Sequence, residues 1–389
     1  MQKFKTLDDM NLGGKTVLVR VDFNVPMTSK GEIKEDTRIK AHLKTITYLS
    51  KAGAKIVLMS HLGNAEQSLQ PVAERLTSLL KKPVTFIDEC VGKKVQVAIK
   101  ELSKSSILLL ENTRFNAGEK TNDEAFAKEL ASLCDIYVND AFATAHRKHA
   151  STYGVAKFSK EKCAGFLLEH ELKTLHEILS NPQKPFVVIT GGAKVSTKLG
   201  ALKALAKKAD TLLIGGAMSN TFLKAMNVEI GKSRFEEDML DEALNIIQIA
   251  SAHNCKIILP SDVKTAVKLE RDTKCENPGI NSINPEHQAF DIGKNTANVW
   301  AEIIKDAGTV LWNGPAGVFE VPPFDAGTRA TAKAVGDTKA FTVIGGGDSI
   351  HAAALCGITE KVDYISTGGG SLLQFIEGVP LPAIEALYK

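Results

Sequence analysis

The sequence predicts an α/β protein with two doubly wound, Rossmann-like parallel-sheet domains joined by a hinge helix. Three observations predict this class. Short apolar runs alternate with longer amphipathic runs along the whole chain, a pattern typical of parallel strands covered by helices on both faces. The chain has 389 residues, more than a single hydrophobic core usually organises. Prolines at 182 and 185 separate the runs into two series.

The expected strands are the short apolar runs. In the first series they span residues 16–21, 55–59, 84–87, 106–110 and 135–138. In the second series they span residues 186–190, 211–214, 256–259, 309–312, 341–344 and 363–366. Amphipathic helices are expected between them, for example over residues 39–51, 123–133, 235–252 and 298–305.

A long helix over residues 161–179 is expected to connect the two domains. It is followed by Ser180-Asn181-Pro182, and a proline ends a helix because it lacks the backbone N–H and clashes with the preceding turn. We therefore expect a first domain over residues 1–172 and a second over residues 173–376.

Composition and charge exclude several classes of protein. The apolar share of 44% argues against disorder, and a net charge of +3 is too small to predict binding to nucleic acid or membrane. The six cysteines include no CxxC pair, which argues against a zinc or redox site of that type. The charged N-terminus does not resemble a signal peptide, and no apolar run approaches the ~18 residues of a membrane span. We expect a cytoplasmic protein.

Ligands of parallel sheets bind outside the carboxyl ends of the strands. In the first series these ends carry arginine, histidine, asparagine and aspartate. The residues concerned are Asp22, Asn24, Arg38, His61, Asn64, Arg114, His146, Arg147 and His149. Guanidinium groups bind phosphate or carboxylate, and Asp and Asn bind hydroxyls, so the first domain is predicted to bind a small anionic, hydroxylated ligand. A metal site at His146 and His149 is not expected, because no acidic or thiolate partner lies at metal spacing.

The second series ends its strands in glycine turns. They are Gly191-Gly192, Gly215-Gly216, Asn313-Gly314-Pro315, Gly345-Gly346-Gly347 and Gly368-Gly369-Gly370. Such turns let backbone amides approach a polyphosphate. Asp348 and Ser349 follow the triple glycine; Asp348 is either a helix cap or a ligand of Mg²⁺ beside that phosphate.

The stretch of residues 186–198 combines a strand, a glycine turn, an expected helix start and two cations. Lys194 and Lys198 lie four residues apart and would share a helical face. This combination predicts a phosphate-binding turn, and an ordinary strand-to-helix turn with solvated lysines is the alternative. Gly14-Lys15-Thr16 is not the end of a Walker A loop, because Asp9 replaces the first glycine, and no G-x-G-x-x-G follows a strand. A first domain that binds a small anion, joined to a second domain that binds a nucleotide, indicates an enzyme that transfers a phosphoryl group.

Eight motifs, in order along nearly the whole chain, resemble the phosphoglycerate kinase family. They are Arg20-Val-Asp-Phe-Asn-Val-Pro26, Ser60-His-Leu-Gly63, Glu111-Asn-Thr-Arg-Phe115, Asp140-Ala-Phe-Ala-Thr-Ala-His-Arg147, Gly191-Gly-Ala-Lys-Val-Ser-Thr-Lys198, Trp312-Asn-Gly-Pro-Ala-Gly-Val-Phe-Glu320, Gly345-Gly-Gly-Asp-Ser349 and Ser366-Thr-Gly-Gly-Gly370.

The resemblance implies reversible transfer of the acyl phosphate of 1,3-bisphosphoglycerate to Mg-ADP, giving 3-phosphoglycerate and ATP. It implies that the first domain binds the glycerate, that the second binds the nucleotide, and that residues 377–389 pack back on the first domain. A monomer that closes about its hinge is expected.

The resemblance also implies roles for individual residues. Arg38 and Lys198 are the catalytic residues, and Asp348 is the residue that acts through Mg²⁺. The substrate-binding residues are Asp22, Phe23, Asn24, Arg38, His61, Leu62, Gly63, Asn64, Arg114 and Arg147. The nucleotide-binding residues are Gly191, Gly192, Lys194, Lys198, Gly215, Gly216, Asn313, Pro315, Glu320, Gly346, Gly347, Asp348 and Ser349. Both nucleophiles, an ADP oxygen and a carboxylate, are ionised near neutral pH, so no general base is expected.

Asn64 departs from the family pattern, which has arginine after Ser60-His61-Leu62-Gly63. An amide lacks the positive charge and the paired N–H donors of a guanidinium, so we expect the protein to bind the non-transferred phosphate more weakly. Asn64→Arg is therefore expected to lower the KM for 3-phosphoglycerate in steady-state kinetics. An unchanged KM would show that this position does not contact the phosphate.

Two alternatives stay open from the residues alone. One is another kinase that phosphorylates a carboxylate, such as a short-chain acid kinase. The other is a two-domain protein that closes on a small anion without chemistry. Asp22, Asn24 and the basic residues favour a phosphorylated hydroxy acid over a simple acid, and the Lys198/Asp348 pair argues for catalysis.

Overall fold

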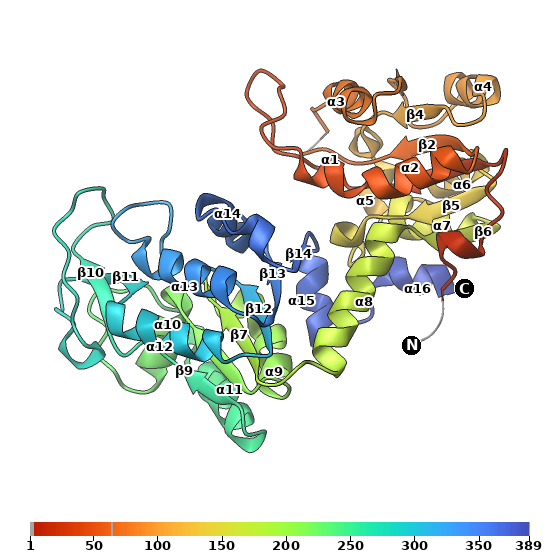
Figure 1. The fold of residues 1–389 in the computed structure, drawn as a ribbon. Helices are drawn as coiled ribbons and strands as arrows, with labels where there is room; N and C mark the ends of the chain where they lie inside the picture. Colours follow the sequence, from red (N-terminus) through yellow and green to blue (C-terminus); the bar gives the residue numbers. More distant parts are fainter. Residues whose placement is uncertain (1–3, 64, 389) are drawn as a thin grey trace. The chain divides into compact units, whose positions relative to one another are not determined.

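The computed structural model describes residues 4–63 and 65–388. It divides the chain into two compact units. The first unit holds the described residues up to Thr174 together with those from Pro380 on, and the second holds Leu175–Val379. Each unit contains a six-stranded parallel sheet with helices between its strands (Figure 1), which confirms the predicted α/β class.

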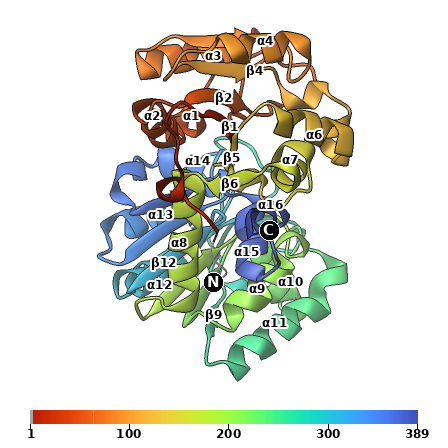
Figure 2. The same ribbon diagram turned by 90° about the vertical axis from the view of Figure 1, so that its right-hand side faces the viewer.

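The sheet of the first unit has the order β3-β4-β2-β1-β5-β6. Five of its labels follow one another in this order in Figure 2. Its strands are β1 (Thr16–Arg20), β2 (Lys55–Met59), β3 (Val84–Ile87), β4 (Ile107–Leu110), β5 (Ile136–Asn139) and β6 (Glu161–Ala164). Strand β1 lies between β2 and β5, so the chain leaves it in one direction and later returns on its other side. This is the topological switch point at which ligands of such sheets bind.

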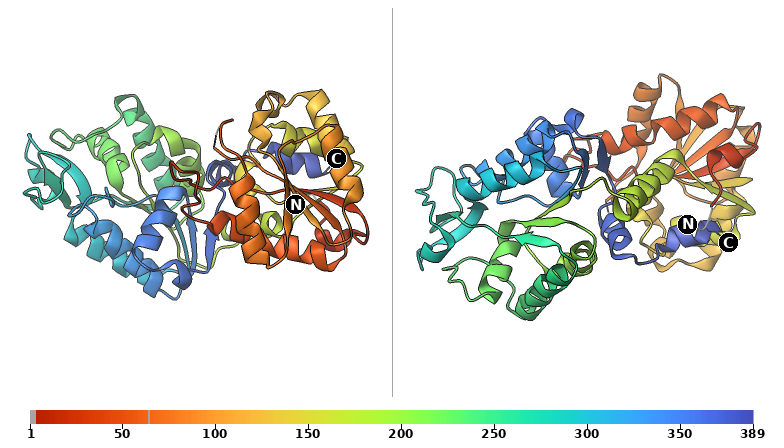
Figure 3. Two further views of the ribbon diagram at one scale, coloured as in Figure 1. Left: turned by 90° about the horizontal axis from the view of Figure 1, so that it is seen from above. Right: turned by 60° about the horizontal axis from the view of Figure 1, so that its bottom comes forward.

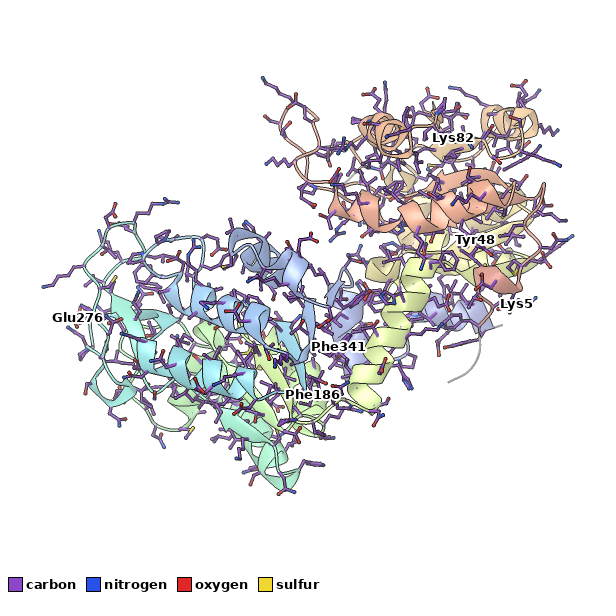
Figure 4. The ribbon with its side chains drawn as sticks, viewed as in Figure 1. Lys5, Tyr48, Lys82, Phe186, Glu276 and Phe341 are labelled. Carbon is purple, nitrogen blue, oxygen red and sulfur yellow. The ribbon has the colours of Figure 1, made fainter. Side chains whose placement is uncertain are left out.

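Alternate residues of these strands form a core with the helices on one face. Val17, Val19 and Val21 are fully buried in one cluster with Ile39, Ile46 and other apolar residues of the neighbouring helices. The helices of the first unit are α1 (Thr37–Ala41), α2 (Leu43–Lys51), α3 (Gln70–Leu80), α4 (Lys93–Glu101), α5 (Gly118–Thr121), α6 (Glu124–Ser132), α7 (Val155–Phe158) and α16 (Pro382–Tyr388). Tyr48 of α2, labelled in Figure 4, packs edge-on against Phe166 with ring centroids 4.9 Å apart.

The last helix, α16, belongs to the first unit although it ends the chain. It contacts α7 and β6, and the backbone N–H of Ala383 donates to the carbonyl of Ala145 at 3.1 Å. Figure 3 shows this dark blue helix beside the yellow segments of the first unit.

The second unit repeats the doubly wound arrangement with the sheet order β14-β13-β12-β7-β8-β9. Its strands are β7 (Phe186–Thr190), β8 (Thr211–Ile214), β9 (Lys256–Ile258), β12 (Thr309–Asn313), β13 (Phe341–Gly345) and β14 (Tyr364–Ser366), and an antiparallel pair adds β10 (Val263–Ala266) and β11 (Gln288–Ile292). Its helices are α9 (Leu199–Ala206), α10 (Gly216–Ala225), α11 (Leu240–Ala252), α12 (Lys294–Lys305), α13 (Ala326–Asp337), α14 (Gly347–Leu355) and α15 (Gly370–Glu377). Phe186 and Phe341, labelled in Figure 4, both lie in register with Thr309 at the amino edge of this sheet, so the glycine turns share the opposite edge.

The predicted single helix over residues 161–179 is wrong. Residues Glu161–Ala164 form the edge strand β6, and the helix α8 spans Phe166–Ser180. The two elements meet at Gly165, where a Cβ would lie 2.1 Å from the Asp140 carboxylate, so the chain turns sharply around that side chain. The residues of α8 up to Thr174 belong to the first unit, and those from Leu175 on belong to the second.

Two further predictions need correction. The expected helix over residues 39–51 is interrupted at His42, which separates α1 from α2. Strands β10 and β11 were not predicted. Within the described part of the chain, no helix has both the length and the apolar character that crossing a membrane requires.

Candidate active site

Asp22 lies at the centre of the candidate site in the first unit, directly after β1. Its Oδ2 accepts a hydrogen bond from Arg38 Nη1 at 2.6 Å, and its Oδ1 lies 3.8 Å from His61 Nδ1. Burial alone would raise the pKa of this carboxyl, but the nearby charges of Arg38, His61 and Arg20 outweigh burial and leave its pKa below the ordinary value. Asp22 is therefore an ionised carboxylate that holds a guanidinium beside it.

Backbone and amide contacts fix the loop of residues 60–63 next to this carboxylate. Asn24 Oδ1 accepts from the backbone N–H of Gly63 at 2.8 Å, and Asn112 bonds Leu62 through its Oδ1 at 3.1 Å and its Nδ2 at 2.7 Å. The backbone N–H of Phe23 donates to Ser60 Oγ at 2.9 Å, and the Phe23 ring is fully buried. The buried side chains of Phe23 and Leu62 thus hold this loop in place. Asn64 lies outside the described residues.

The remaining basic residues of this site are crowded together. Arg114 donates through Nη1 to the carbonyl of Gly63, and no described residue accepts a hydrogen bond from its buried Nε. Burial lowers its pKa, and the charges of Arg147 and Arg20 lower it further. Burial lowers the pKa of His146 to about 4, with Arg147 adding to the shift. Mutual repulsion of this kind among partly buried cations is relieved by an anion.

Arg20 is a member of this group whose role the sequence did not reveal. Its side chain is fully buried at the end of β1, where Nε donates to Ser151 Oγ at 2.8 Å and Nη2 lies 3.1 Å from His61 Nδ1. Ser151 Oγ in turn donates to the buried Glu119 at 2.6 Å. An arginine inside an otherwise apolar strand was the signal that could have identified it.

In the second unit the candidate site is the edge where the carboxyl ends of β7 and β12 lie side by side. Gly191 and Gly314 are required there by close packing. A Cβ on Gly191 would lie 2.0 Å from the carbonyl oxygen of Pro315. Gly314 has a φ of +116°, and its Cβ would lie 2.4 Å from the carbonyl oxygen of Gly191. The two glycine turns therefore pack backbone against backbone and leave an edge lined by main-chain groups.

Lys198 joins these two turns. Its Nζ donates to the carbonyl of Gly191 at 2.9 Å and to the carbonyl of Asn313 at 2.7 Å. Burial lowers the pKa of this ammonium group to about 8, while the charge of Asp348 opposes the shift. A partly buried cation whose hydrogen bonds to described residues go to neutral carbonyls is well suited to receive a phosphate oxygen.

The predicted helical face shared by Lys194 and Lys198 is wrong. The helix starts only with the 3-10 turn Ser196–Lys198 and continues as α9, so the exposed Lys194 precedes it. The carboxylate of Glu236 occupies the start of this turn, where Oε1 accepts from Ser196 Oγ at 2.5 Å and Oε2 accepts from the Ser196 backbone N–H at 3.1 Å. The backbone N–H of Ser196 therefore already donates a hydrogen bond to a carboxylate of the protein itself.

The other glycine turns start helices. Gly215 and Gly216 precede and begin α10. Gly346 precedes α14, and Gly347 and Asp348 are exposed in its first turn. Ser349 is buried and accepts from the backbone N–H of Gly314 at 2.5 Å, which ties α14 to the turn after β12. First-turn N–H groups have no acceptor within their own helix, so this turn can bind an anion. Glu320 follows the turn after β12 in the chain and is exposed. Gly192 lies next to Gly191 in the turn after β7.

The described residues contain no group of three or more His, Cys, Asp or Glu side chains arranged to hold a metal ion. Mg²⁺ in kinases is bound by one or two carboxylates together with substrate phosphates and water rather than by a closed protein cage. The exposed Asp348, close enough to Lys198 to affect its pKa, offers one such carboxylate. The residues present therefore fit a metal that arrives with the nucleotide.

Replacing Glu236 by alanine is expected to raise the KM for the substrate that binds at the glycine turns of the second unit about fivefold, equivalent to ~1 kcal/mol, because the turn at Ser196 loses its cap. The KM for a substrate of the first unit should stay the same. Steady-state kinetics measures both values, and Glu237→Ala, at the exposed neighbouring position, is the matched control. If Glu236→Ala leaves the first of these KM values unchanged or lowers it, Glu236 does not hold this turn in place for binding.

Comparison with known proteins decides the family. A family model described as phosphoglycerate kinase matches residues 7–379. The chain belongs to the phosphoglycerate kinase family. It is 48% identical to the phosphoglycerate kinase of Herpetosiphon aurantiacus, covering 98% of each chain. It is 46% identical to that of Desulforapulum autotrophicum, covering 98% of this chain and 100% of the relative. The structure of phosphoglycerate kinase from Coxiella burnetii matches with a TM-score of 0.89 and 42% identity over 99% of this chain and 98% of that one.

Membership of the phosphoglycerate kinase family confirms the predicted activity. The protein is a glycolytic kinase that uses ATP and ADP and transfers phosphate to and from the carboxylate of 3-phosphoglycerate. The short-chain acid kinase and the non-catalytic anion-binding protein are not favoured. The same finding shows that the substrates of the protein are small molecules.

Proposed function

We propose that the two candidate sites divide the substrates of this kinase between them. The first unit binds 3-phosphoglycerate or 1,3-bisphosphoglycerate, and the second binds ADP or ATP. The observation that supports this division is the contrast in chemistry. The first site is an ionised Asp22 among crowded cations, suited to a hydroxylated anion, whereas the second is a glycine-lined edge with Lys198, suited to a polyphosphate. For these two domains we propose the limits predicted from the sequence, residues 1–172 with 377–389 and residues 173–376; the compact units of the structure divide close to them, after Thr174 and after Val379.

Within the first site we propose the contacts that membership of the phosphoglycerate kinase family implies. Asp22 and Asn24 hold the glycerate hydroxyl and carboxylate region, and Arg38 contacts the transferring phosphoryl group. His61, Arg114 and Arg147 bind the phosphate that is not transferred. The buried Nε of Arg114, which donates to none of the residues that the structure describes, supports this role, because a buried donor is costly unless it is satisfied.

Within the second site Lys198 and the first turn of α14 bind the nucleotide phosphates. Lys194, Gly346, Gly347 and Ser349 complete this phosphate site. The nucleoside is assigned to the turns at Gly191-Gly192, Gly215-Gly216 and Asn313-Gly314-Pro315, and Glu320 binds the ribose. Asp348 holds Mg²⁺, which neutralises charge on the phosphates when it is bound.

The reaction then needs no proton transfer. In the ATP-forming direction an oxygen of the ADP β-phosphate attacks the phosphorus of the acyl phosphate. The bond between that phosphorus and the acyl oxygen breaks, and the carboxylate leaves as an anion. The chain supplies charge stabilisation through Arg38, Lys198 and helix amides. His42, which is paired with Asp140, is not available as a base, because both of its ring nitrogens are already hydrogen-bonded.

A coupled assay tests the proposal. The protein is mixed with ATP, Mg²⁺ and 3-phosphoglycerate, and product formation is followed through a reductive coupling step. Activity with 3-phosphoglycerate, its loss on chelation of Mg²⁺, and its absence with acetate as acceptor are the expected results. Turnover that persists without divalent metal would contradict the role of Mg²⁺. A cytoplasmic location and a monomeric state stay predictions of the sequence.

A further inference from the structure

His42 separates α1 from α2 and lies beneath the candidate site of the first unit. Its side chain is only 1% exposed, and both of its ring nitrogens are engaged. The backbone N–H of Asp22 donates to His42 Nε2 at 2.9 Å, and His42 Nδ1 lies 2.8 Å from Asp140 Oδ2. The ring edge also packs on Phe23, with centroids 5.6 Å apart and planes at 78°.

The hydrogen-bond directions fix the protonation of this histidine. A backbone N–H can only donate, so Nε2 must accept and carries no proton. Nδ1 therefore carries the proton and donates to the Asp140 carboxylate. The ring is a neutral imidazole with one defined tautomer, set by the bond that its other nitrogen makes.

Asp140, which accepts the hydrogen bond from His42, is itself held in place by further hydrogen bonds. It is fully buried after β5, and its backbone N–H donates to the carbonyl of Arg20 at 2.9 Å. Its Oδ1 accepts from the backbone N–H groups of Leu167 at 2.9 Å and Leu168 at 3.4 Å in the first turn of α8. The carboxylate thus links the start of α8 to His42, and His42 links it to the backbone of Asp22.

We propose that His42 is a positioning residue for phosphoryl transfer. It holds the Asp22 backbone through Nε2, so that the Asp22 carboxylate keeps Arg38 at 2.6 Å in the orientation that the substrate meets. Without an acceptor at Nε2, the Asp22 N–H is buried and unsatisfied, and the turn at Asp22 shifts to satisfy it. This inference depends on the proposed assignment of Asp22 and Arg38 to the substrate site.

A purely structural role is the competing explanation, because buried histidines commonly stabilise a core by satisfying their own hydrogen bonds. Two substitutions separate the explanations. In His42→Asn the amide nitrogen lies near the position of Nδ1 and can donate to Asp140, but no atom reaches the Asp22 N–H. In His42→Gln the longer side chain places its oxygen near the position of Nε2, where it can accept from Asp22.

The experiment measures kcat, the KM of each substrate and the midpoint of thermal unfolding for both variants. We expect kcat/KM for 3-phosphoglycerate to fall about tenfold in His42→Asn, the effect of one lost buried hydrogen bond. His42→Gln should stay within about threefold of the parent protein, because it restores the acceptor. The KM for ATP should be unchanged in both variants. Equal effects of the two variants, or losses that follow thermal stability alone, would overturn the proposal.

A measurement on the unsubstituted protein keeps the proposal testable if a variant fails to fold. In ¹⁵N NMR of the histidine side chains, His42 must show a protonated Nδ1 and an unprotonated Nε2. A protonated Nε2 would overturn the proposal. Arg38→Ala is measured in the same assay. If Arg38→Ala lowers turnover and His42→Asn does not, the inference alone fails; if Arg38→Ala has no effect either, the assignment of the substrate site fails with it.

Discussion

Replacing Arg38 by alanine is expected to lower kcat by about 10³-fold or more, the effect of a well-placed arginine on phosphoryl transfer. The KM for 3-phosphoglycerate should change far less. Arg38 stabilises charge that develops on the moving phosphoryl group, whereas His61, Arg114 and Arg147 supply most of the ground-state binding. Steady-state kinetics in both directions separates the two effects.

Arg75 provides a matched control for this substitution. It also lies on a helix of the first unit, its guanidinium contacts Asp36 at 2.6 Å, and its side chain is 41% exposed, against 36% for Arg38. Arg75→Ala removes an arginine of similar exposure from an ion pair that is not part of the candidate site, and should leave kcat unchanged. A near-normal kcat in Arg38→Ala would remove Arg38 from the transition state.

Replacing Lys198 by methionine is expected to lower kcat by about 10²- to 10³-fold, comparable to losing one preorganised donor at a developing charge. The KM for ADP should rise as well, because Lys198 also joins the turns at Gly191 and Asn313. Lys264 is the matched control in the second unit, since its Nζ likewise donates to a carbonyl, that of Pro323, at 2.9 Å. Lys264→Met should keep kcat.

The pH dependence gives an independent test of Lys198. Burial lowers its pKa to about 8 in the nucleotide-free protein. Only the protonated ammonium binds phosphate, and it is lost as pH rises through that pKa. We therefore expect kcat/KM for ADP, which reports the free enzyme, to fall above about pH 8. In Lys198→Arg the charge persists to far higher pH, so the decline should disappear. An unchanged decline in this variant would assign the titration to another group.

Strands β2, β3, β7 and β8 begin and end where the sequence predicted. Three of them are continuous apolar runs that are buried over nearly their whole length, whereas β3 is a partly exposed strand at the edge of its sheet. Strand β6 was missed because Glu161 and Lys162 make it polar and because it lies at the end of its sheet, beside β5. The break at His42 was missed because no glycine or proline marks it; the interruption coincides with two tertiary hydrogen bonds.

The candidate site, like the fold, could be predicted where the signal is local in the sequence and not where it depends on residues far apart. The polar residues after each strand could be named because the carboxyl ends of parallel strands share one edge of a sheet. Three supporting contacts could not be predicted, because each joins residues far apart in sequence. Arg20 and Ser151 are 131 residues apart, His42 and Asp140 are 98 apart, and Ser196 and Glu236 are 40 apart. No local pattern identifies such partners.

A crystal structure of the protein with bound ADP tests the division of substrates between the two units most directly. We expect the two phosphates of ADP beside Lys198 and the first turn of α14 at Gly347 and Asp348, in the second unit. ADP phosphates bound instead by Arg38, Arg114 and Arg147 of the first unit would contradict this division.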